Sequence, residues 1–469
     1  MTPEVAQSLP PRSPDGRTYT FKIRSGLRFS PPSNQPVTAQ TFKATIERTL
    51  NPGTRSGYAP YLADIVGAGA YMSGKASHIT GVIAYGDTLT IRLLASAPDF
   101  LARLSQPPGS CAVPSNTPVN RDGLSRLPSA GPYYVTSYTQ HQGVVLMRNP
   151  NYHGRRPHHF ARIELAVGVS TKQAVSEIEA GLADYTPVGL EASAGAASAA
   201  HLSQLAARYG AGSAAAARGA QQYFDNPASQ LDYFVLNTHR PLFSDVRMRQ
   251  AVNYAIDRRA LARLGDAFAP VPAQPASHYL PPGMPGFRDA HLYPMTPNIV
   301  KARNLAQGGG RTAVLYTCDV SPCQEQAQIV KTNLAAIGLQ VHITTVPFAN
   351  YFTQLSNPDK PFDLAWDGWL PDYIDPAGML NPILQDSTWG PTFDDPAYRR
   401  RLAAAARLTG PERYLAYGQL DLDLARDAAP LAAFDNLTEH DFYSARIGCQ
   451  TFGIYGMDLG ALCIKPARG

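Results

Sequence analysis

The chain has 469 residues, of which 44% are hydrophobic and 16% charged, so it has enough apolar material for more than one hydrophobic core. Its net charge of +5 is the balance of 41 basic and 36 acidic residues, and the basic residues lack the aromatic interleaving of nucleic-acid-binding surfaces. No window reaches the roughly 18 apolar residues that a membrane span requires. Composition therefore argues against a nucleic-acid partner and an integral membrane protein, and favours two or three folded lobes.

The N-terminal part of the chain has the patterns of an α+β lobe. Strict alternation of apolar residues predicts a strand over 18–24. A helix is expected to begin after Thr38, a favourable N-cap, and to end at Leu50 before an Asn-Pro pair. A second alternating strand over 89–93 follows a Gly-Asp hairpin signal. We assign this lobe to residues 1–125.

A proline- and glycine-rich stretch at 128–132 predicts a boundary after this lobe. The helix that we expect further on should bury Val175, Ile178 and Leu182 on one face. The strands and the helix predicted beyond the boundary lie at 133–138, 144–148 and 171–181.

The C-terminal half contains the pattern of a βαβ unit. A strand over 311–317, a helix over 324–337 ended by Gly338, and a strand over 340–346 follow within about 35 residues. Such a unit has parallel strands, and the apolar start of segment 362–367 is expected to join the same sheet. Ligands bind beyond the carboxyl ends of strands in open parallel sheets, so the residues after this segment are candidates for a binding site.

The segment 362–376 is the most informative part of the sequence for function. Within it, the ten residues 366–375 present two indoles and three carboxylates around the end of the predicted strand. Buried Trp and Asp side chains need polar partners, so their concentration at one strand end suggests a concave site with aromatic walls and an acidic anchor. The alternative is a core strand whose tryptophans only pack, followed by a solvated acidic turn.

The five cysteines suggest an oxidising compartment. Cys318 and Cys323 are close in sequence, as are Cys449 and Cys463, and Cys111 stands apart. We expect two local disulfides and one free thiol. The alternative is a metal site, although no histidine lies at ligand spacing from either pair. Neither a metal nor a cofactor is expected.

Several motifs in chain order resemble family 5 extracellular solute-binding proteins, the peptide-binding receptors of bacterial ABC importers. The resemblance covers nearly the whole chain, and its most specific part is the segment Asp245–Arg258, with sequence DVRMRQAVNYAIDR. The other matching segments are 3–8, 15–29, 37–39, 129–133, 148–152, 237–238, 279–286, 301–305 and 368–376. Family members normally begin with a secretion signal and several dozen further residues that supply a first strand; this sequence has neither.

The resemblance implies an α/β fold of the periplasmic-binding-protein type II kind, with two hinged lobes and an extra α+β domain inserted in the first lobe. Residues 1–125 would be the extra domain. Residues 126–240, completed by 440–469, would be the first lobe, and residues 241–439 the second. A ligand would close the lobes because it contacts both of them.

The same resemblance implies a ligand site around the Trp/Asp segment. In peptide-binding relatives the carboxylate at the position of Asp372 pairs with the α-ammonium group of the ligand. Trp366 and Trp369 would offer apolar faces, and Gly368 would let the ligand backbone approach. Further candidates are two wall residues and two residues near the expected hinge, namely Tyr373, Phe434, Tyr233 and Asn237.

The sequence thus predicts a peptide receptor of an ABC importer, acting as a monomer with a membrane permease, in the periplasm or at the cell surface and with a lipid anchor as one option. A sugar, a nickel complex or an opine in the same fold is the alternative ligand. An enzyme is the third reading, but the chain has no Gly-x-Ser-x-Gly, His-Glu-x-x-His or phosphate-binding glycine motif. We therefore expect no catalysis.

Overall fold

The computed structural model describes residues 2–120, 123–124, 126–188, 199–267, 271–307, 310–357, 359, 362–384, 392–453 and 456–466. The chain forms two compact units. Unit 1 comprises residues 1–169 with 447–453 and 457–469, and unit 2 comprises residues 170–446 with 454–456. The three-part division given above stays a prediction.

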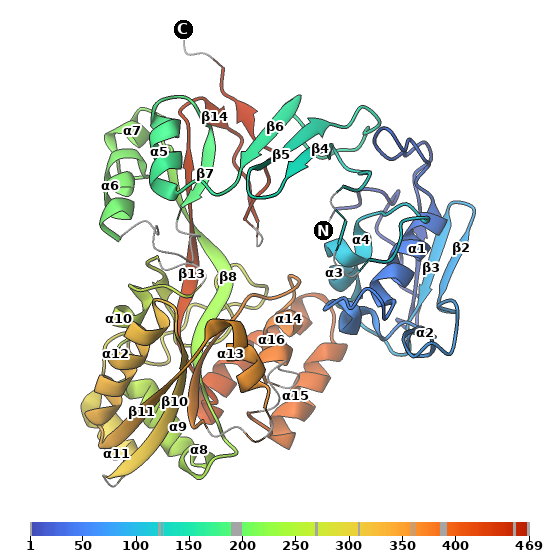
Figure 1. Ribbon diagram of the computed structural model, residues 1–469. Helices are drawn as coiled ribbons and strands as arrows, with labels where there is room; N and C mark the ends of the chain where they lie inside the picture. The colour runs from blue at the N-terminus through green and yellow to red at the C-terminus, as the bar shows by residue number, and fades with distance from the viewer. Residues whose placement is uncertain are drawn as a thin grey trace. The chain divides into compact units, whose positions relative to one another are not determined.

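Unit 1 contains two three-stranded antiparallel sheets, of order β1-β3-β2 and β4-β5-β6 (Figure 1). Two short ladders, β14-β17 and β15-β16, lie near the C-terminus of the chain. The strands predicted from alternation are confirmed here. The bounds are β1 Thr18–Lys22, β2 Val82–Tyr85, β3 Thr88–Arg92, β4 Tyr133–Thr139, β5 Gly143–Arg148, β6 Arg162–Ala166, β14 Ile447–Gly448, β15 Phe452–Gly453, β16 Gly456–Met457 and β17 Cys463–Ile464.

The helix predicted after Thr38 is the main helix of unit 1 and packs on its sheet. The main-chain N–H of Thr38 donates to Thr41 Oγ1 over 3.1 Å, which fixes the start of the helix. Phe42, Ile46 and Leu50 are buried in the unit's hydrophobic core. The helices are α1 Ala39–Leu50, η1 Ala59–Leu62, α2 Ala68–Met72, α3 Phe100–Leu104 and α4 Pro107–Ser110.

Unit 2 is built on one mixed sheet of order β11-β10-β12-β8-β13-β7, in which β9 also pairs with β13. Strands β10, β11 and β12 are parallel, which confirms the βαβ prediction and the predicted place of β12 in that sheet. Strand β8 is antiparallel to both of its neighbours. The bounds are β7 Tyr185–Val188, β8 Tyr223–Leu236, β9 Gln274–Pro275, β10 Arg311–Cys318, β11 Leu339–Val346, β12 Leu364–Trp369 and β13 Leu431–Tyr443.

Helices of unit 2 pack on this sheet, and α12 connects β10 to β11. Gly338 follows α12 with a φ of +81°, a left-handed conformation that glycine adopts without strain, as predicted. The helices are α5 Thr171–Glu179, α6 Ala199–Tyr209, α7 Ala214–Ala217, α8 Pro241–Ser244, α9 Val246–Ala255, α10 Arg258–Ala262, α11 Ile299–Ala306, α12 Cys323–Ala335, α13 Phe348–Leu355, α14 Pro376–Leu384, α15 Pro396–Arg407, α16 Gly410–Asp423 and the π-helical turn η2 Leu424–Ala428.

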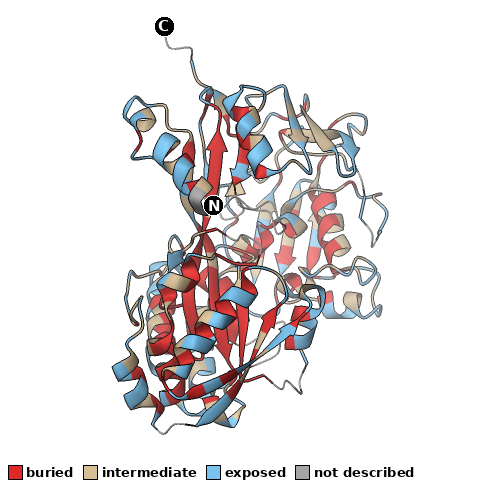
Figure 2. Ribbon diagram, turned by 60° about the vertical axis from the view of Figure 1, so that its left-hand side comes forward, coloured by how far each residue is buried: buried red, intermediate tan, exposed pale blue. Residues whose placement is uncertain are grey.

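Two hydrophobic cores share the long strands β8 and β13, which run between α5 and α6 at one end and α9, α10 and α12 at the other (Figure 1). Both strands are buried along much of their length (Figure 2). Val175 and Ile178 join the smaller core as predicted. The prediction that Leu182 is buried was wrong: it is 80% exposed, because α5 ends at Glu179 and Gly181 turns the chain away with a φ of +75°.

Both predicted disulfides are confirmed. Cys318, the last residue of β10, is bonded to Cys323, the first residue of α12. Cys449 is bonded to Cys463 near the end of the chain, and Cys111 is a free thiol. Across the described ranges, no helix combines the length and the apolar character needed to cross a membrane.

Candidate functional site

Strand β12 and the residues after it form the candidate site, and the sheet fixes their position. The strand is parallel to β10 and antiparallel to β8, where Trp369 lies opposite Leu231. It ends at Trp369, and a short connection leads into α14 at Pro376. Gly368, Trp369 and Asp372 therefore lie at or beyond the carboxyl end of a strand in the parallel part of the sheet, where ligand sites occur in such folds.

The three carboxylates of residues 366–375 have different environments. Asp367 is fully buried and accepts hydrogen bonds from the main-chain N–H of Gly368 and from Tyr233 Oη, over 2.8 and 3.2 Å. Asp375 is also buried and accepts a 2.7 Å bond from Arg413 Nη2. Asp372 is only partly buried. Of these three acids, Asp372 is the one that keeps part of its surface exposed.

The two indoles also differ. Trp366 is 1% exposed and its ring centroid lies 6.0 Å from that of Tyr351 in the large core. Trp369 is partly exposed, and its Nε1 donates to the carbonyl oxygen of Gly378 over 2.9 Å. This hydrogen bond fixes the orientation of the Trp369 ring while leaving part of its surface open. Trp369 is therefore the better placed of the two to contact a ligand.

Gly368 is required by the protein interior. A Cβ atom on this residue would lie 2.5 Å from Oδ1 of Asp232, whose carboxylate is fully buried. Any side chain would therefore force that carboxylate or the strand to move. The role expected for Gly368 in admitting a ligand backbone stays a prediction, but the structure gives it a packing reason of its own.

The remaining predicted contacts are buried. Tyr373 is 4% exposed, and Phe434 packs against Phe234 with ring centroids 5.3 Å apart. Tyr233 donates to Asp367, as described above. Asn237 Nδ2 donates to the carbonyl oxygen of Phe362 over 3.2 Å, which ties the end of β8 to the start of the β12 segment. These contacts position β12, and a contact of these four residues with a ligand stays a prediction.

Two apolar residues beside Asp372 were missed by the sequence reasoning. Leu370 is 40% exposed and Ile374 is 44% exposed. They stand two residues before and two residues after Asp372. This alternation of apolar and acidic residues directly after the Trp/Asp motif was the signal that could have pointed to them.

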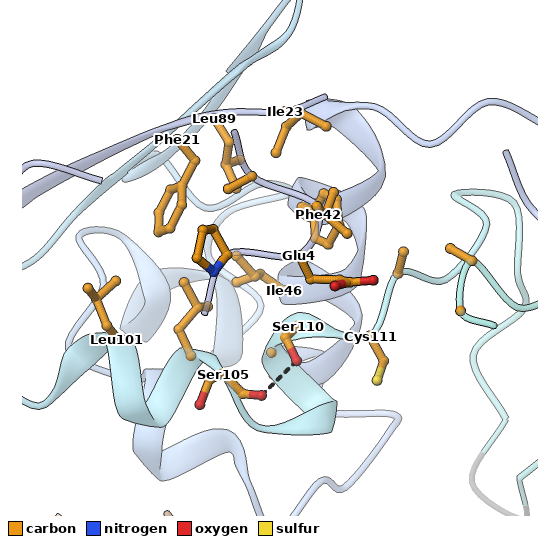
Figure 3. Close-up of a pocket in the computed structure, with 18 of the residues that line it drawn as sticks. Glu4, Phe21, Ile23, Phe42, Ile46, Leu89, Leu101, Ser105, Ser110 and Cys111 are labelled. Carbon is orange, nitrogen blue, oxygen red and sulfur yellow. Dashed lines mark hydrogen bonds between the residues drawn. The ribbon is translucent and has the colours of Figure 1, made fainter. Parts of the chain in front are cut away.

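Unit 1 contains a cavity of about 550 Å³ that the sequence did not predict. Figure 3 shows apolar side chains from β1, α1, β3 and α3 around it, with Cys111 and Glu4 also on its wall. Ser110 Oγ, at the end of α4, donates to the carbonyl oxygen of Ser105 over 2.9 Å there. The cavity is mainly apolar.

The sequence of the chain matches a known protein family over most of its length. Residues 1–391 match the model of the bacterial extracellular solute-binding proteins, family 5 Middle. The chain belongs to this family. The family consists of solute-binding proteins.

Individual members of family 5 support the assignment. The chain is 24% identical over 415 residues to the oligopeptide-binding protein OppA of Bacillus subtilis, covering 83% of this chain and 71% of that protein. It is 25% identical over 391 residues to the probable deoxycholate-binding periplasmic protein YgiS of Escherichia coli, covering 79% and 68%. The solved structure of clavulanic acid biosynthesis oligopeptide binding protein 2 has a TM-score of 0.82 at 22% identity, covering 99% of this chain and 87% of that one. The predicted type II periplasmic-binding-protein fold is confirmed.

Proposed function

We propose that this family 5 protein is the receptor of an ABC import system and that it captures peptides by pairing their α-ammonium group with Asp372. The carrying observation is that Asp372, beyond the carboxyl end of β12, keeps part of its surface exposed, whereas Asp367 and Asp375 are buried. Peptide binding by similar family members, such as the Bacillus subtilis protein, supports the same ligand class.

A carboxylate at this place is suited to an ammonium group. A cation that leaves water on binding needs a counter-ion, and removing the partner of a desolvated ion pair costs roughly 2–5 kcal/mol. Trp369, Leu370 and Ile374 lie within three residues of the acid in sequence, and each exposes apolar surface. Such surface strengthens the pairing by excluding water, and it favours an apolar side chain next to the ammonium group.

A non-peptide solute is the second candidate. It is favoured by the similarity of the chain to a relative named as deoxycholate-binding. The identity to that relative is 25%, against 24% to the oligopeptide-binding relative. Sugars, nickel complexes and opines belong to the same alternative. With such a solute, Asp372 would accept hydrogen bonds from hydroxyl groups, and the free ammonium group would have no importance.

Calorimetry with matched peptides separates these candidates. A set of di- to pentapeptides is titrated into the protein, each with a free and with an acetylated N-terminus, at low ionic strength. We expect binding of free peptides only, and a loss of about 30-fold or more in affinity for Asp372→Asn. Asp289→Asn, at a solvent-exposed acid, serves as the control.

Two results would count against the peptide anchor. One is equal affinity of the Asp372→Asn variant and the parent protein for a free peptide, and the other is equal binding of free and acetylated peptides. The further elements of the proposal are a membrane permease as partner, a monomeric state and a place outside the cytoplasm with or without a lipid anchor. They rest on family membership and not on the geometry of the site.

A further inference from the structure

A group of buried acids lies between the two cores of unit 2, directly behind the candidate site. Asp232 on β8 and Asp435 on β13 are cross-strand partners, and both are 0% exposed. Asp266, which follows α10, is also fully buried. Gln230 Nε2 donates to Asp232 Oδ1 over 3.0 Å and makes a second, short contact with Asp266. Two of the three carboxyl groups, those of Asp232 and Asp266, thus share one amide donor.

The oxygens of the Asp232–Asp435 pair lack enough donors for two carboxylates. Neither Oδ1 nor Oδ2 of Asp435, nor Oδ2 of Asp232, has a hydrogen-bond donor among the described groups. An unpaired buried carboxylate is strongly disfavoured, and two adjacent ones are more so. A proton held on one carboxyl group supplies the missing donor, because the resulting hydroxyl can donate to the other group.

The groups that face the pair do not neutralise it. Asp266 adds a further acid, and on β12 the residue facing Asp232 is Gly368, which has no side chain. Arg258 of α10 lies against β13, but its Nε donates to the main-chain carbonyl of Ala433 over 2.8 Å. Next to Asp266, Gln326 of α12 donates to the Gly265 carbonyl, and on β9 the residue paired with Asp435 is the neutral Pro275.

Burial sets the protonation of the pair. Loss of hydration raises the pKa of Asp435 to about 8, and Asp266 acts in the same direction while contact with Asp232 opposes it. Burial also raises the pKa of Asp232 well above its ordinary value, with Asp266 and Asp435 as further causes. The described residues include no group of three His, Cys, Asp or Glu side chains arranged to hold a metal ion.

The position of the pair connects it to the candidate site. The pairing of β8 with β13 shifts register between Ala433 and Asp435, and again between Asn436 and Thr438. These shifts lie where the larger core gives way to the smaller one, and such bulges bend a strand. Asp232 also faces Gly368 across β8 and β12, so a movement of its carboxylate acts on the strand that carries Trp369.

We propose that Asp232 and Asp435 form a proton-sharing pair of positioning residues, which hold the bulged part of β8 and β13 and keep β12 in its binding geometry. When the pair loses its proton at alkaline pH, the two carboxylates repel each other and ligand affinity falls. The part of this inference that concerns affinity rests on the proposed function, whereas the proton sharing is a property of the fold.

The proton sharing is tested by unfolding in urea at pH values from 5 to 8. A carboxyl group with a raised folded pKa keeps its proton while the unfolded chain loses it, so stability falls with rising pH. Each retained proton increases the unfolding equilibrium constant about tenfold per pH unit. We expect the Asp232→Asn/Asp435→Asn double variant to lack this component, and Asp289→Asn to keep it. If stability depends on pH equally steeply in the double variant and the parent protein, the proposed proton sharing is refuted.

Two further measurements keep the test decisive if the double variant does not fold. Asp435→Asn alone has an amide donor at position 435, and its stability should depend less steeply on pH than that of the parent protein. Infrared difference spectra of the parent protein should show the carbonyl band of a protonated carboxyl group at pH 7, and its absence would refute the proposal. A slope that changes on addition of a chelator would show that a bound cation, and not a proton, neutralises the pair.

The effect on the site is tested by peptide affinity between pH 6 and 9. The α-ammonium group titrates near 7.7–8.0, so affinity falls with pH in every variant, and the informative quantity is the ratio of parent protein to Asp435→Asn. We expect this ratio to fall by up to about tenfold per pH unit above the folded pKa of about 8, and a constant ratio would refute the positioning role. If no peptide binds at any pH, the proposed function fails, while the unfolding slopes still decide whether the proton is shared.

Discussion

Arg413 and Asp375 form a buried ion pair in which Nη2 of the guanidinium group lies 2.7 Å from Oδ1 of the carboxylate. Their side chains are only 3% and 6% exposed. The arginine comes from α16, and the aspartate comes from the connection between β12 and α14. Asp375 also accepts a hydrogen bond from the main-chain N–H of Ala377 over 2.9 Å. The pair therefore fixes the segment that carries Asp372.

Removal of one member of this pair should destabilise the protein and disturb the site. For Arg413→Met we expect a loss of roughly 3–5 kcal/mol in the free energy of unfolding, because the Asp375 charge is left buried and unpaired. Peptide affinity should also fall, since the connection after β12 loses its anchor. Urea unfolding and calorimetry measure the two effects. Asp375→Asn with Arg413→Met should recover part of the stability, and failure to do so would mean that the charge is not the cause.

The two tryptophans of the motif should respond differently to truncation. Trp366→Ala removes a buried ring and should cost roughly 3–5 kcal/mol of stability. Trp369→Ala should cost less stability, because its ring is partly exposed, but should weaken peptide binding by about 1 kcal/mol or more. Thermal unfolding and calorimetry on both variants provide the comparison. Loss of affinity for Trp366→Ala at full stability would reverse the assignment.

Stability should fall as the pH rises from about 4.5 to 7 because of Glu439 on β13. Burial, followed by the nearby charge of Asp441, raises the pKa of Glu439 to about 7. The unfolded chain ionises first as pH rises, so the loss accumulates up to the folded pKa and then stops. A rise from 4.5 to about 7 corresponds to about 3.5 kcal/mol, and the expected loss is smaller because Glu439 is partly exposed and water screens its charge. Glu439→Gln should remove this component in urea unfolding at pH 5 and 8, and an unchanged difference would contradict it.

The two disulfides should contribute unequally. The chain-entropy model gives about 3 kcal/mol for Cys449–Cys463 and about 2 kcal/mol for Cys318–Cys323, because the first closes a longer loop. Alanine replacement of both cysteines of a pair, one pair at a time, followed by urea unfolding, measures each contribution. A larger loss for the shorter loop would indicate that packing around the buried Cys318 and Cys323, and not chain entropy, dominates.

Elements defined by local sequence were predictable. The N-cap at Thr38, the parallel strands around α12 and the left-handed Gly338 depend on short-range periodicity and turn chemistry, which the sequence shows directly. The predicted place of the Trp/Asp motif at a strand end in that sheet followed from the same reasoning. The family resemblance supplied the ligand class, which local pattern alone does not give.

The buried acid pair and the burial of the site residues depend on contacts between distant parts of the chain. Asp232 and Asp435 become partners only when β8 and β13 pair, and their bulges follow from that pairing. The burial of Trp366 and Asp367 depends on a central place of β12 in the sheet, where both faces are covered, so no alternation distinguishes packing from binding. Long-range register is the information that a single sequence lacks.

The state of the five cysteines also has a practical consequence. Because the other four are closed in disulfides, Cys111 is a native attachment point for a single fluorophore, and it stands on the wall of the cavity in unit 1. A thiol-reactive dye at this position needs no engineered mutation. Its emission would report whether small molecules enter that cavity while peptide capture is followed independently by calorimetry.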